Sequence, residues 1–145
     1  MDRIRVLLAD DHEVMLERVA GLLSTECDVV GTVTDGQQAL EAARELKPDV
    51  LVLDISMPVI NGIETAHRLK EAADQTRIVF LTVHDDADFA REALAAGALG
   101  YVIKQRMASD LIAAIKEAHA GRPFLGLGGN DNTEGAAPSR WGKRS

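Results

Sequence analysis

The stretch LLADDHE, residues 7–13, joins an apolar run to two adjacent carboxylates and then to residues that can begin a helix. The run starts at Ile4 and stops at Asp10 and Asp11. Short apolar runs of this kind are typical of strands that are buried on both faces of a parallel sheet. Adjacent like charges at the end of such a strand repel each other. The pair therefore raises the question of what stabilises two carboxylates at this point.

Four more apolar runs follow, and a longer segment with a helical repeat comes after each run. In these segments apolar residues recur about every 3.6 residues, which is the period of an amphipathic helix. The alternation predicts an α/β fold with a parallel sheet and helices on both faces. Five such units favour the flavodoxin-like (βα)5 arrangement, a doubly wound sheet with strand order 2-1-3-4-5. The expected strands are residues 4–9, 29–33, 50–53, 78–82 and 100–103.

Capping and helix-breaking residues predict where the helices begin and end. Asn61 and Ser109 precede the third and fifth helical segments, and both residue types commonly cap helix N-termini. Pro48 closes the second segment, because proline cannot continue a helix. Gly97 and Gly121 follow the fourth and fifth segments, where glycine often ends a helix. One helix is therefore expected after each strand.

Length and composition indicate one folded domain followed by a tail. A chain of 145 residues with 46% hydrophobic residues can bury one compact core. Aromatic residues make up only 3%, so this core is built mainly from aliphatic side chains. The domain is expected at residues 1–121. Residues 122–145 are rich in Gly, Asn, Pro and Ser without an apolar period, and we expect a flexible tail or the remnant of a linker there.

Charge and cysteine content narrow the possible functions. The net charge is −7, and the acidic excess lies before residue 121, which disfavours direct binding of nucleic acid by this chain. The single cysteine, Cys27, excludes an internal disulfide and is expected to be a small packing residue. The first apolar run is too short for a signal peptide, and no segment is long enough to span a membrane. These features predict a cytoplasmic protein.

Polar side chains lie at the carboxyl ends of four of the five expected strands. Asp10 and Asp11 end the first strand, Asp54 the third, Thr82 the fourth and Lys104 the fifth. In doubly wound sheets ligands bind at the carboxyl ends of the strands, so these groups are expected to meet. Three carboxylates on an apolar scaffold need a cation, and Mg²⁺ suits a shallow site with oxygen ligands. An acid set, a hydroxyl and an ammonium are the parts that phosphoryl transfer requires.

The motifs LLADDHE, VLVLDISMPVING, IVFLT and GALGYVIK resemble the receiver domain of two-component response regulators. They are most similar to the NarL/FixJ (LuxR-type) branch, which joins a receiver to a helix-turn-helix DNA-binding domain. The resemblance covers roughly residues 3–120, and these motifs, taken together in the correct order, make it specific. It implies a phosphorylatable receiver that controls an output, transcription in full-length relatives.

The resemblance implies specific roles for the acidic residues. Asp54 corresponds to the phosphoacceptor, a carboxylate that forms an acyl phosphate. Asp11 corresponds to a direct Mg²⁺ ligand and Asp10 to the acid that holds a metal-bound water. Asp54 and the backbone carbonyl of Ser56 complete the implied ligand set.

It also implies roles for three residues on the last two strands. Thr82 corresponds to the switch hydroxyl that closes on the phosphoryl group, and Lys104 to the ammonium that pairs with it. Tyr101 corresponds to the aromatic residue that turns inward when Thr82 moves. One departure is Gln105, since many receivers have proline after the lysine. His12 and His84 have no metal-ligand partner at useful spacing in the sequence and are interpreted as partly exposed surface or rim residues.

The implied partner is a sensor histidine kinase, with a possible homodimer on phosphorylation and no membrane. The chain is not expected to be an enzyme beyond its own phosphorylation and dephosphorylation. Only 24 residues follow Gly121, too few for a DNA-binding domain of about 60 residues. The chain is therefore either a stand-alone receiver or a truncated relative of a transcription regulator.

Three other functions fit parts of the pattern. A phosphatase with an Asp nucleophile would normally carry Asp-x-Asp and a cap, and DISMP provides neither. A flavin-binding electron carrier shares the fold, but the acids of DDHE would repel the FMN phosphate. A phosphorylation-independent receiver that serves only as a protein-interaction module is the third alternative, which the complete set of acids disfavours.

Overall fold

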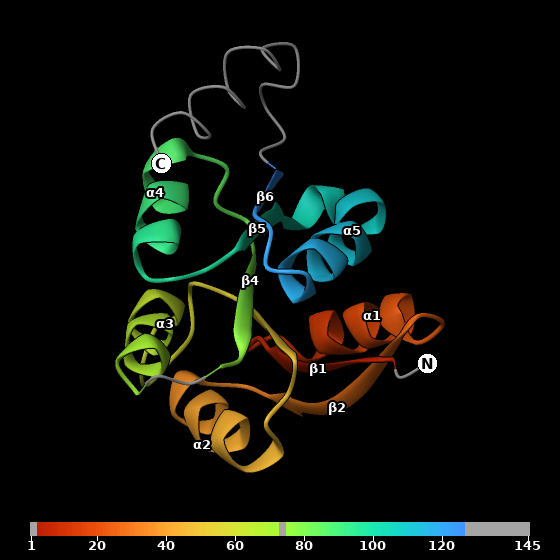
Figure 1. Ribbon diagram of the computed structural model, residues 1–145, viewed down its shortest axis with the longest axis horizontal. Coiled ribbons are helices and arrows are strands. Elements are labelled where there is room, and N and C mark those ends of the chain that lie inside the picture. Colours follow the sequence, from red (N-terminus) through yellow and green to blue (C-terminus); the bar gives the residue numbers. More distant parts are fainter. Residues whose placement is uncertain (1–2, 73–74, 127–145) are drawn as a thin grey trace.

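The computed structural model describes residues 3–72 and 75–126, which form one parallel sheet between two layers of helices. Figure 1 shows α1 and α5 on one side of the sheet and α2, α3 and α4 on the other. Strands and helices alternate along the chain in the order β1 (Ile4–Ala9), α1 (Glu13–Leu23), β2 (Cys27–Val33), α2 (Gly36–Leu46), β3 (Val50–Leu53), α3 (Gly62–Glu71), β4 (Arg77–Thr82), α4 (Ala87–Ala95), β5 (Gly100–Ile103), α5 (Met107–His119) and β6 (Phe124–Gly126), with a short 3₁₀ turn (Lys104–Arg106) before α5.

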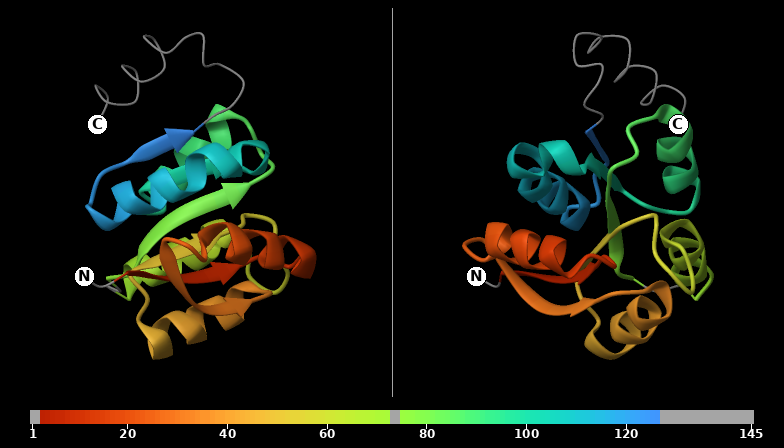
Figure 2. Two further views of the ribbon diagram at one scale, coloured as in Figure 1. Left: turned by 90° about the vertical axis from the view of Figure 1, so that its right-hand side faces the viewer. Right: turned by 180° about the vertical axis from the view of Figure 1, so that it is seen from behind.

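The strand order is β2-β1-β3-β4-β5-β6, and every neighbouring pair is parallel. The arrows in the left view of Figure 2 accordingly point in one direction. The predicted flavodoxin-like fold and the order of its first five strands are confirmed. Since β1 and β3 are neighbours in the sheet, the residues that follow them share one edge.

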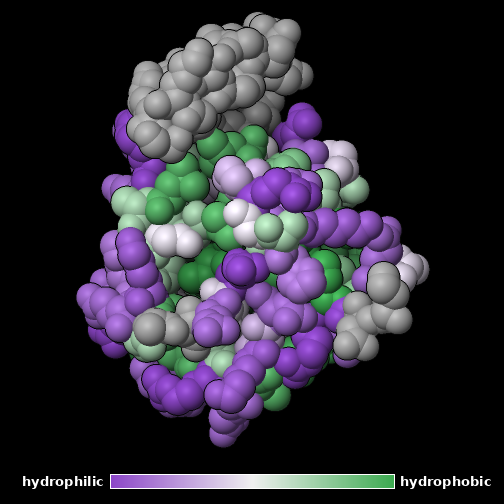
Figure 3. Space-filling model, viewed as in Figure 1, coloured by the Kyte–Doolittle hydropathy of each residue, from purple (hydrophilic) through white to green (hydrophobic). Residues whose placement is uncertain are grey.

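Alternate side chains of the strands contribute to two separate cores. Residues such as Leu7 and Leu51 pack with α2, α3 and α4, whereas Val6 and Val52 pack with α1 and α5. Cys27 is buried in the second core, which confirms its packing role. On the face shown in Figure 3, hydrophilic residues occupy most of the surface and hydrophobic residues show mainly in smaller patches between them. None of the helices in the described part of the chain is long and apolar enough to cross a membrane.

The expectation of a tail from residue 122 onward is wrong for its first part. Phe124–Gly126 forms β6, which pairs with β5, and Phe124 and Leu125 are half-buried. This run of three residues beside several glycines is too short an apolar pattern to predict a strand. It forms one because it pairs with the edge of β5. The rest of the expected tail, residues 127–145, lies outside the described residues.

Most helix boundaries agree with the capping signals, but one does not. The Asn61 side chain accepts a hydrogen bond from the Glu64 backbone and caps α3 as predicted. The predicted cap of α5 at Ser109 is wrong, because the helix begins at Met107. The Ser109 hydroxyl donates to the Arg106 carbonyl and contacts the Asp110 carboxylate. Its hydrogen-bonding capacity is therefore used inside the first turn.

Candidate functional site

Strand register brings the acidic residues of β1 and β3 together. Ala9 and Leu53 are paired in the sheet, so Asp10 and Asp54 leave neighbouring strands at the same level. The Asp54 N–H donates to the Ala9 carbonyl over 3.0 Å, which extends the pairing to the first residue beyond β3. Both carboxylates are buried, with 5% of each residue exposed. The sheet itself therefore fixes the distance between the two acids.

The acids form one compact cluster, as the sequence predicted. One possible ligand atom from each of Asp10, Asp11, His12 and Asp54 lies within 4.8 Å of all the others. The interpretation of His12 as a residue without useful ligand partners is wrong, because its Nδ1 lies 3.2 Å from Asp10 Oδ1 and 3.1 Å from Asp11 Oδ1. Ligand-spacing rules did not reveal this, since the three residues are consecutive and only the turn of the backbone brings them together.

Lys104 reaches across the strand ends to two of the acids. Its Nζ lies 2.7 Å from Asp10 Oδ2 and 3.2 Å from Asp54 Oδ2. Its side chain is only 10% exposed and those of the two aspartates 6%, so water screens these ion pairs weakly. Lys104 follows β5 directly, and the pairing of Ile103 with Thr82 places it beside the end of β4. The lysine thus belongs to the same site, as expected.

Burial and neighbouring charges perturb the acid–base properties of this pair. Burial raises the pKa of Asp54, and repulsion from Asp10 acts in the same direction, while the Lys104 ammonium opposes both. Burial alone would lower the pKa of Lys104, but its hydrogen bond to Asp10 and the attraction of Asp54 raise it. Lys104 is therefore held as an ammonium beside a carboxylate whose ionised form is disfavoured by burial.

The loop that follows Asp54 is held rigidly against the site. Asp54 Oδ1 accepts a hydrogen bond of 2.7 Å from the Ile55 N–H, and the Gly62 N–H donates to the Ile55 carbonyl over 2.7 Å. A side chain at Gly62 has no space, since a Cβ there would lie 2.0 Å from the Asp54 carbonyl oxygen. Val59 has a φ of +70°, which is strained for a β-branched residue. Such strain often accompanies functional loops.

Thr82 and Tyr101 both contact the backbone of His84. Thr82 is fully buried and its hydroxyl accepts a hydrogen bond of 3.3 Å from the His84 N–H. The Tyr101 hydroxyl donates to the His84 carbonyl over 2.7 Å, and burial raises the pKa of this phenol strongly. Tyr101 is fully buried, so it occupies the inward position in this structure. Its predicted movement with Thr82 stays a prediction.

His84 lies at the rim of the site, as interpreted from the sequence. Its Nε2 lies 3.1 Å from the Ser56 hydroxyl, and its ring stacks on Phe89 with a centroid distance of 4.3 Å. These contacts connect the loop after β3 with the loop after β4. Ser56 is exposed, and the role of its backbone carbonyl in metal binding stays a prediction.

The departure at Gln105 leaves the peptide geometry ordinary. Lys104, Gln105 and Arg106 form a 3₁₀ turn that leads directly into α5, and every peptide bond in the described ranges is trans. The lysine therefore reaches the acids without the proline that often follows it in similar sequences.

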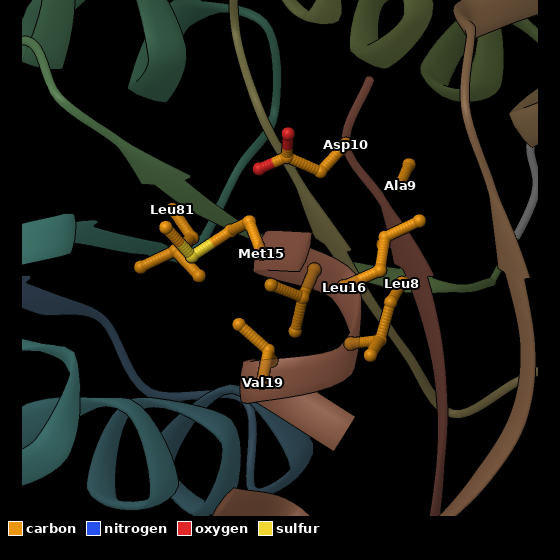
Figure 4. Close-up of a pocket in the computed structure, with 8 residues that line it drawn as sticks. Leu8, Ala9, Asp10, Met15, Leu16, Val19 and Leu81 are labelled. Atoms are coloured by element: carbon orange, nitrogen blue, oxygen red, sulfur yellow. The ribbon is translucent and has the colours of Figure 1, made fainter. Parts of the chain in front are cut away.

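The small pocket beneath Asp10 does not form a ligand site. Figure 4 shows the Asp10 carboxylate at one side of a group of apolar side chains from β1, α1 and β4. The pocket volume is about 10 Å³, which is room for one water molecule at most. Within residues 3–72 and 75–126, the donor atoms grouped closely enough to hold a metal ion are those of the acid cluster, where three carboxylates fit a hard divalent cation.

The sequence of this chain is similar to those of known response regulators. Residues 6–116 match the family described as response regulator receiver domain. The transcriptional regulatory protein LnrK of Bacillus subtilis is 36% identical over 124 residues, which cover 84% of this chain and 56% of LnrK. The nitrate/nitrite response regulator NarL of Escherichia coli is 38% identical over 122 residues, or 83% of this chain and 56% of NarL. This chain thus spans little more than half the length of these relatives.

A solved structure extends the likeness to the whole fold. The LuxR-family two-component response regulator of Aurantimonas sp. SI85-9A1 has a TM-score of 0.85 and 31% identity, and the match covers 96% of this chain and 99% of that one. The predicted branch is confirmed, because the relatives include NarL and a LuxR-family protein. Since the family match extends over most of its length, the chain belongs to the response regulator receiver domain family.

Proposed function

We propose that this protein is a phosphorylatable receiver that accepts a phosphoryl group on Asp54 from a sensor histidine kinase. The observation that carries the proposal is the cluster in which a carboxylate oxygen of Asp54 lies within 4.8 Å of the ligand atoms of Asp10 and Asp11, while Lys104 Nζ lies 3.2 Å from Asp54 Oδ2. These four side chains come from three separate strand ends, and an acceptor carboxylate, a cation site and an ammonium are what phosphoryl transfer requires.

Asp54 acts as the nucleophile. One of its carboxylate oxygens attacks the phosphorus of a phosphohistidine, the P–N bond breaks, and the imidazole leaves with the electron pair. The product is an acyl phosphate on Asp54. The Ile55 N–H and Lys104 Nζ hold the two carboxylate oxygens in place before the reaction. Asp11, Asp54 and the Ser56 carbonyl would bind Mg²⁺ directly and Asp10 would hold one of its waters, and the ion would supply positive charge that offsets the charge of the phosphoryl oxygens.

Phosphorylation replaces a single negative charge with roughly two and adds strong acceptor oxygens. Lys104 pairs with these oxygens, and Thr82 donates its hydroxyl to one of them. The Thr82 hydroxyl now accepts from the His84 N–H, and Tyr101 donates to the His84 carbonyl, so His84 couples both residues. A shift of the loop after β4 then changes the surface formed by α4, β5 and α5.

The output follows from the same switch. The altered surface favours a homodimer, and in longer relatives it controls transcription. We expect no direct nucleic-acid binding by the described residues 3–72 and 75–126, because most of them belong to the acidic region of the sequence. It works in the cytoplasm and performs only stoichiometric reactions at Asp54.

Labelled acetyl phosphate tests the assignment. With Mg²⁺, the wild-type protein should incorporate up to one phosphoryl group per chain, and Asp54→Asn should reduce incorporation to background. Asp28→Asn is the matched control, since Asp28 is an exposed aspartate on β2. Labelling of Asp54→Asn at the wild-type level, or wild-type labelling that is unaffected by EDTA, would show that the proposal is wrong.

A further inference from the structure

His12 is part of the acid cluster because of the way α1 begins. It is the N-cap residue of α1, but its side chain makes no capping hydrogen bond. Its backbone N–H instead donates to Asp10 Oδ1 over 2.9 Å, which turns the backbone and directs the imidazole back over the end of β1. The local backbone therefore holds the imidazole ring of His12 beside the acids. The His12 side chain is nevertheless 72% exposed to solvent.

The position of the imidazole nitrogen matches that of a metal ligand. Two donor atoms in neighbouring positions around an octahedral ion, each at about 2.1 Å, lie about 3.0 Å apart. His12 Nδ1 lies 3.2 Å from Asp10 Oδ1 and 3.1 Å from Asp11 Oδ1. Asp10 forms its ion pair with Lys104 through its other oxygen, Oδ2, and Oδ1 is the oxygen that faces His12. One ion can thus contact His12 and Asp11 without displacing Lys104.

We propose that His12 is a metal ligand that makes this site prefer first-row transition dications to Mg²⁺. The inference rests on the metal site of the proposed function and concerns which ion that site selects. Mg²⁺ prefers oxygen ligands, whereas an imidazole nitrogen binds transition metals better. Affinity for nitrogen-containing sites rises from Mn²⁺ to Co²⁺ and Ni²⁺. One nitrogen among three carboxylates should therefore give a graded preference.

The preference can be measured by calorimetry with Mg²⁺, Mn²⁺ and Co²⁺ alone, without a phosphoryl donor. His12→Ala should leave the Mg²⁺ Kd within about twofold of wild type, and weaken Co²⁺ binding by about tenfold or more and Mn²⁺ binding by less. His84→Ala is the matched control, because His84 is the other histidine at the rim but contacts Ser56 and Phe89. It should leave the order of the three affinities unchanged.

Electron spin echo modulation of the Mn²⁺-loaded protein identifies the ligand directly. Coupling to an imidazole ¹⁴N should appear in wild type and in His84→Ala, and disappear in His12→Ala. If wild type binds Mn²⁺ without this coupling, or if His12→Ala weakens all three ions equally, the inference is wrong and the proposed function still holds. If wild type binds none of the three ions, both fail.

Discussion

Asp54 shows at the level of one residue how a buried carboxylate is held in a folded protein. Burial and Asp10 both disfavour its ionised form, and Lys104 compensates only in part, so its pKa is raised. The same carboxylate would ionise more easily in the unfolded chain. Its charge is therefore less stable in the native state than in the unfolded state at neutral pH.

The raised pKa of Asp54 makes the stability of the folded protein depend on pH. The folded-state pKa lies above the unfolded value, so the contribution of Asp54 to stability is most favourable below the unfolded pKa and declines as pH rises through the folded pKa. In EDTA, Asp54→Asn should unfold at a higher temperature than wild type near neutral pH, and the difference should shrink toward about pH 4. Thermal unfolding followed by circular dichroism measures both. A difference that is independent of pH would argue against a perturbed Asp54.

Val59 carries strain that a different side chain should relieve. It has a φ of +70° and is 76% exposed, so it gains little from packing. A left-handed conformation costs a residue with a side chain about 1–2 kcal/mol, and asparagine tolerates it better than valine. Val59→Asn should raise the free energy of unfolding by about 0.5–1 kcal/mol in urea titrations. Val83→Asn, at an exposed valine without a positive φ, should bring no gain.

At the level of elements, the bounds of most strands were predictable from the sequence, whereas the start of α5 and the short strand β6 were not. β1 and β3–β5 lie within one residue of the expected ranges, because each is a continuous apolar run. The start of α5 was misplaced, since Ser109 can use its hydroxyl within the helix as well as before it. β6 was missed because Phe124–Gly126 is a strand only through its partner β5.

The junction of β3 and α3 is closely packed, and glycine substitutions can test this. A Cβ at Gly62 would lie 2.0 Å from the Asp54 carbonyl oxygen, whereas a Cβ at Gly21 in α1 would meet nothing within 4 Å. Gly62→Ala should therefore destabilise the protein by about 3 kcal/mol or more, because the backbone must move. Gly21→Ala should stabilise it by up to about 1 kcal/mol through helix propensity. If Gly62→Ala and Gly21→Ala changed the free energy of unfolding in urea equally, the proposed difference in packing would be wrong.

At the level of the whole molecule, the site was predictable because sheet topology converts distant sequence positions into neighbours. Asp10, Asp54, Thr82 and Lys104 were placed by one rule, that parallel strands share a carboxyl edge. His12 was not, since its contact with Asp10 and Asp11 depends on the local turn before α1. The bridge from Tyr101 to the His84 carbonyl also depends on loop geometry, which no residue pattern encodes.

β6 closes one edge of the sheet, and truncation should reveal its contribution. A chain ending at residue 121 loses the half-buried Phe124 and Leu125 and exposes the edge of β5. It should be less stable than a chain ending at residue 126 by about 2–3 kcal/mol, given the apolar area that these side chains bury. Urea titration of the two truncated chains measures the difference. Equal midpoints would mean that β6 contributes nothing to stability.

The ion pair between Lys104 and Asp54 joins residues 50 positions apart in the chain. A ribosome adds about 5–20 residues per second, so several seconds separate the synthesis of the two partners. During that interval the nascent chain already contains Asp54 but has no Lys104 to pair with it. Only after β5 has been made and has docked can the ammonium offset the buried charge of this aspartate, so a half-made protein cannot assemble the site.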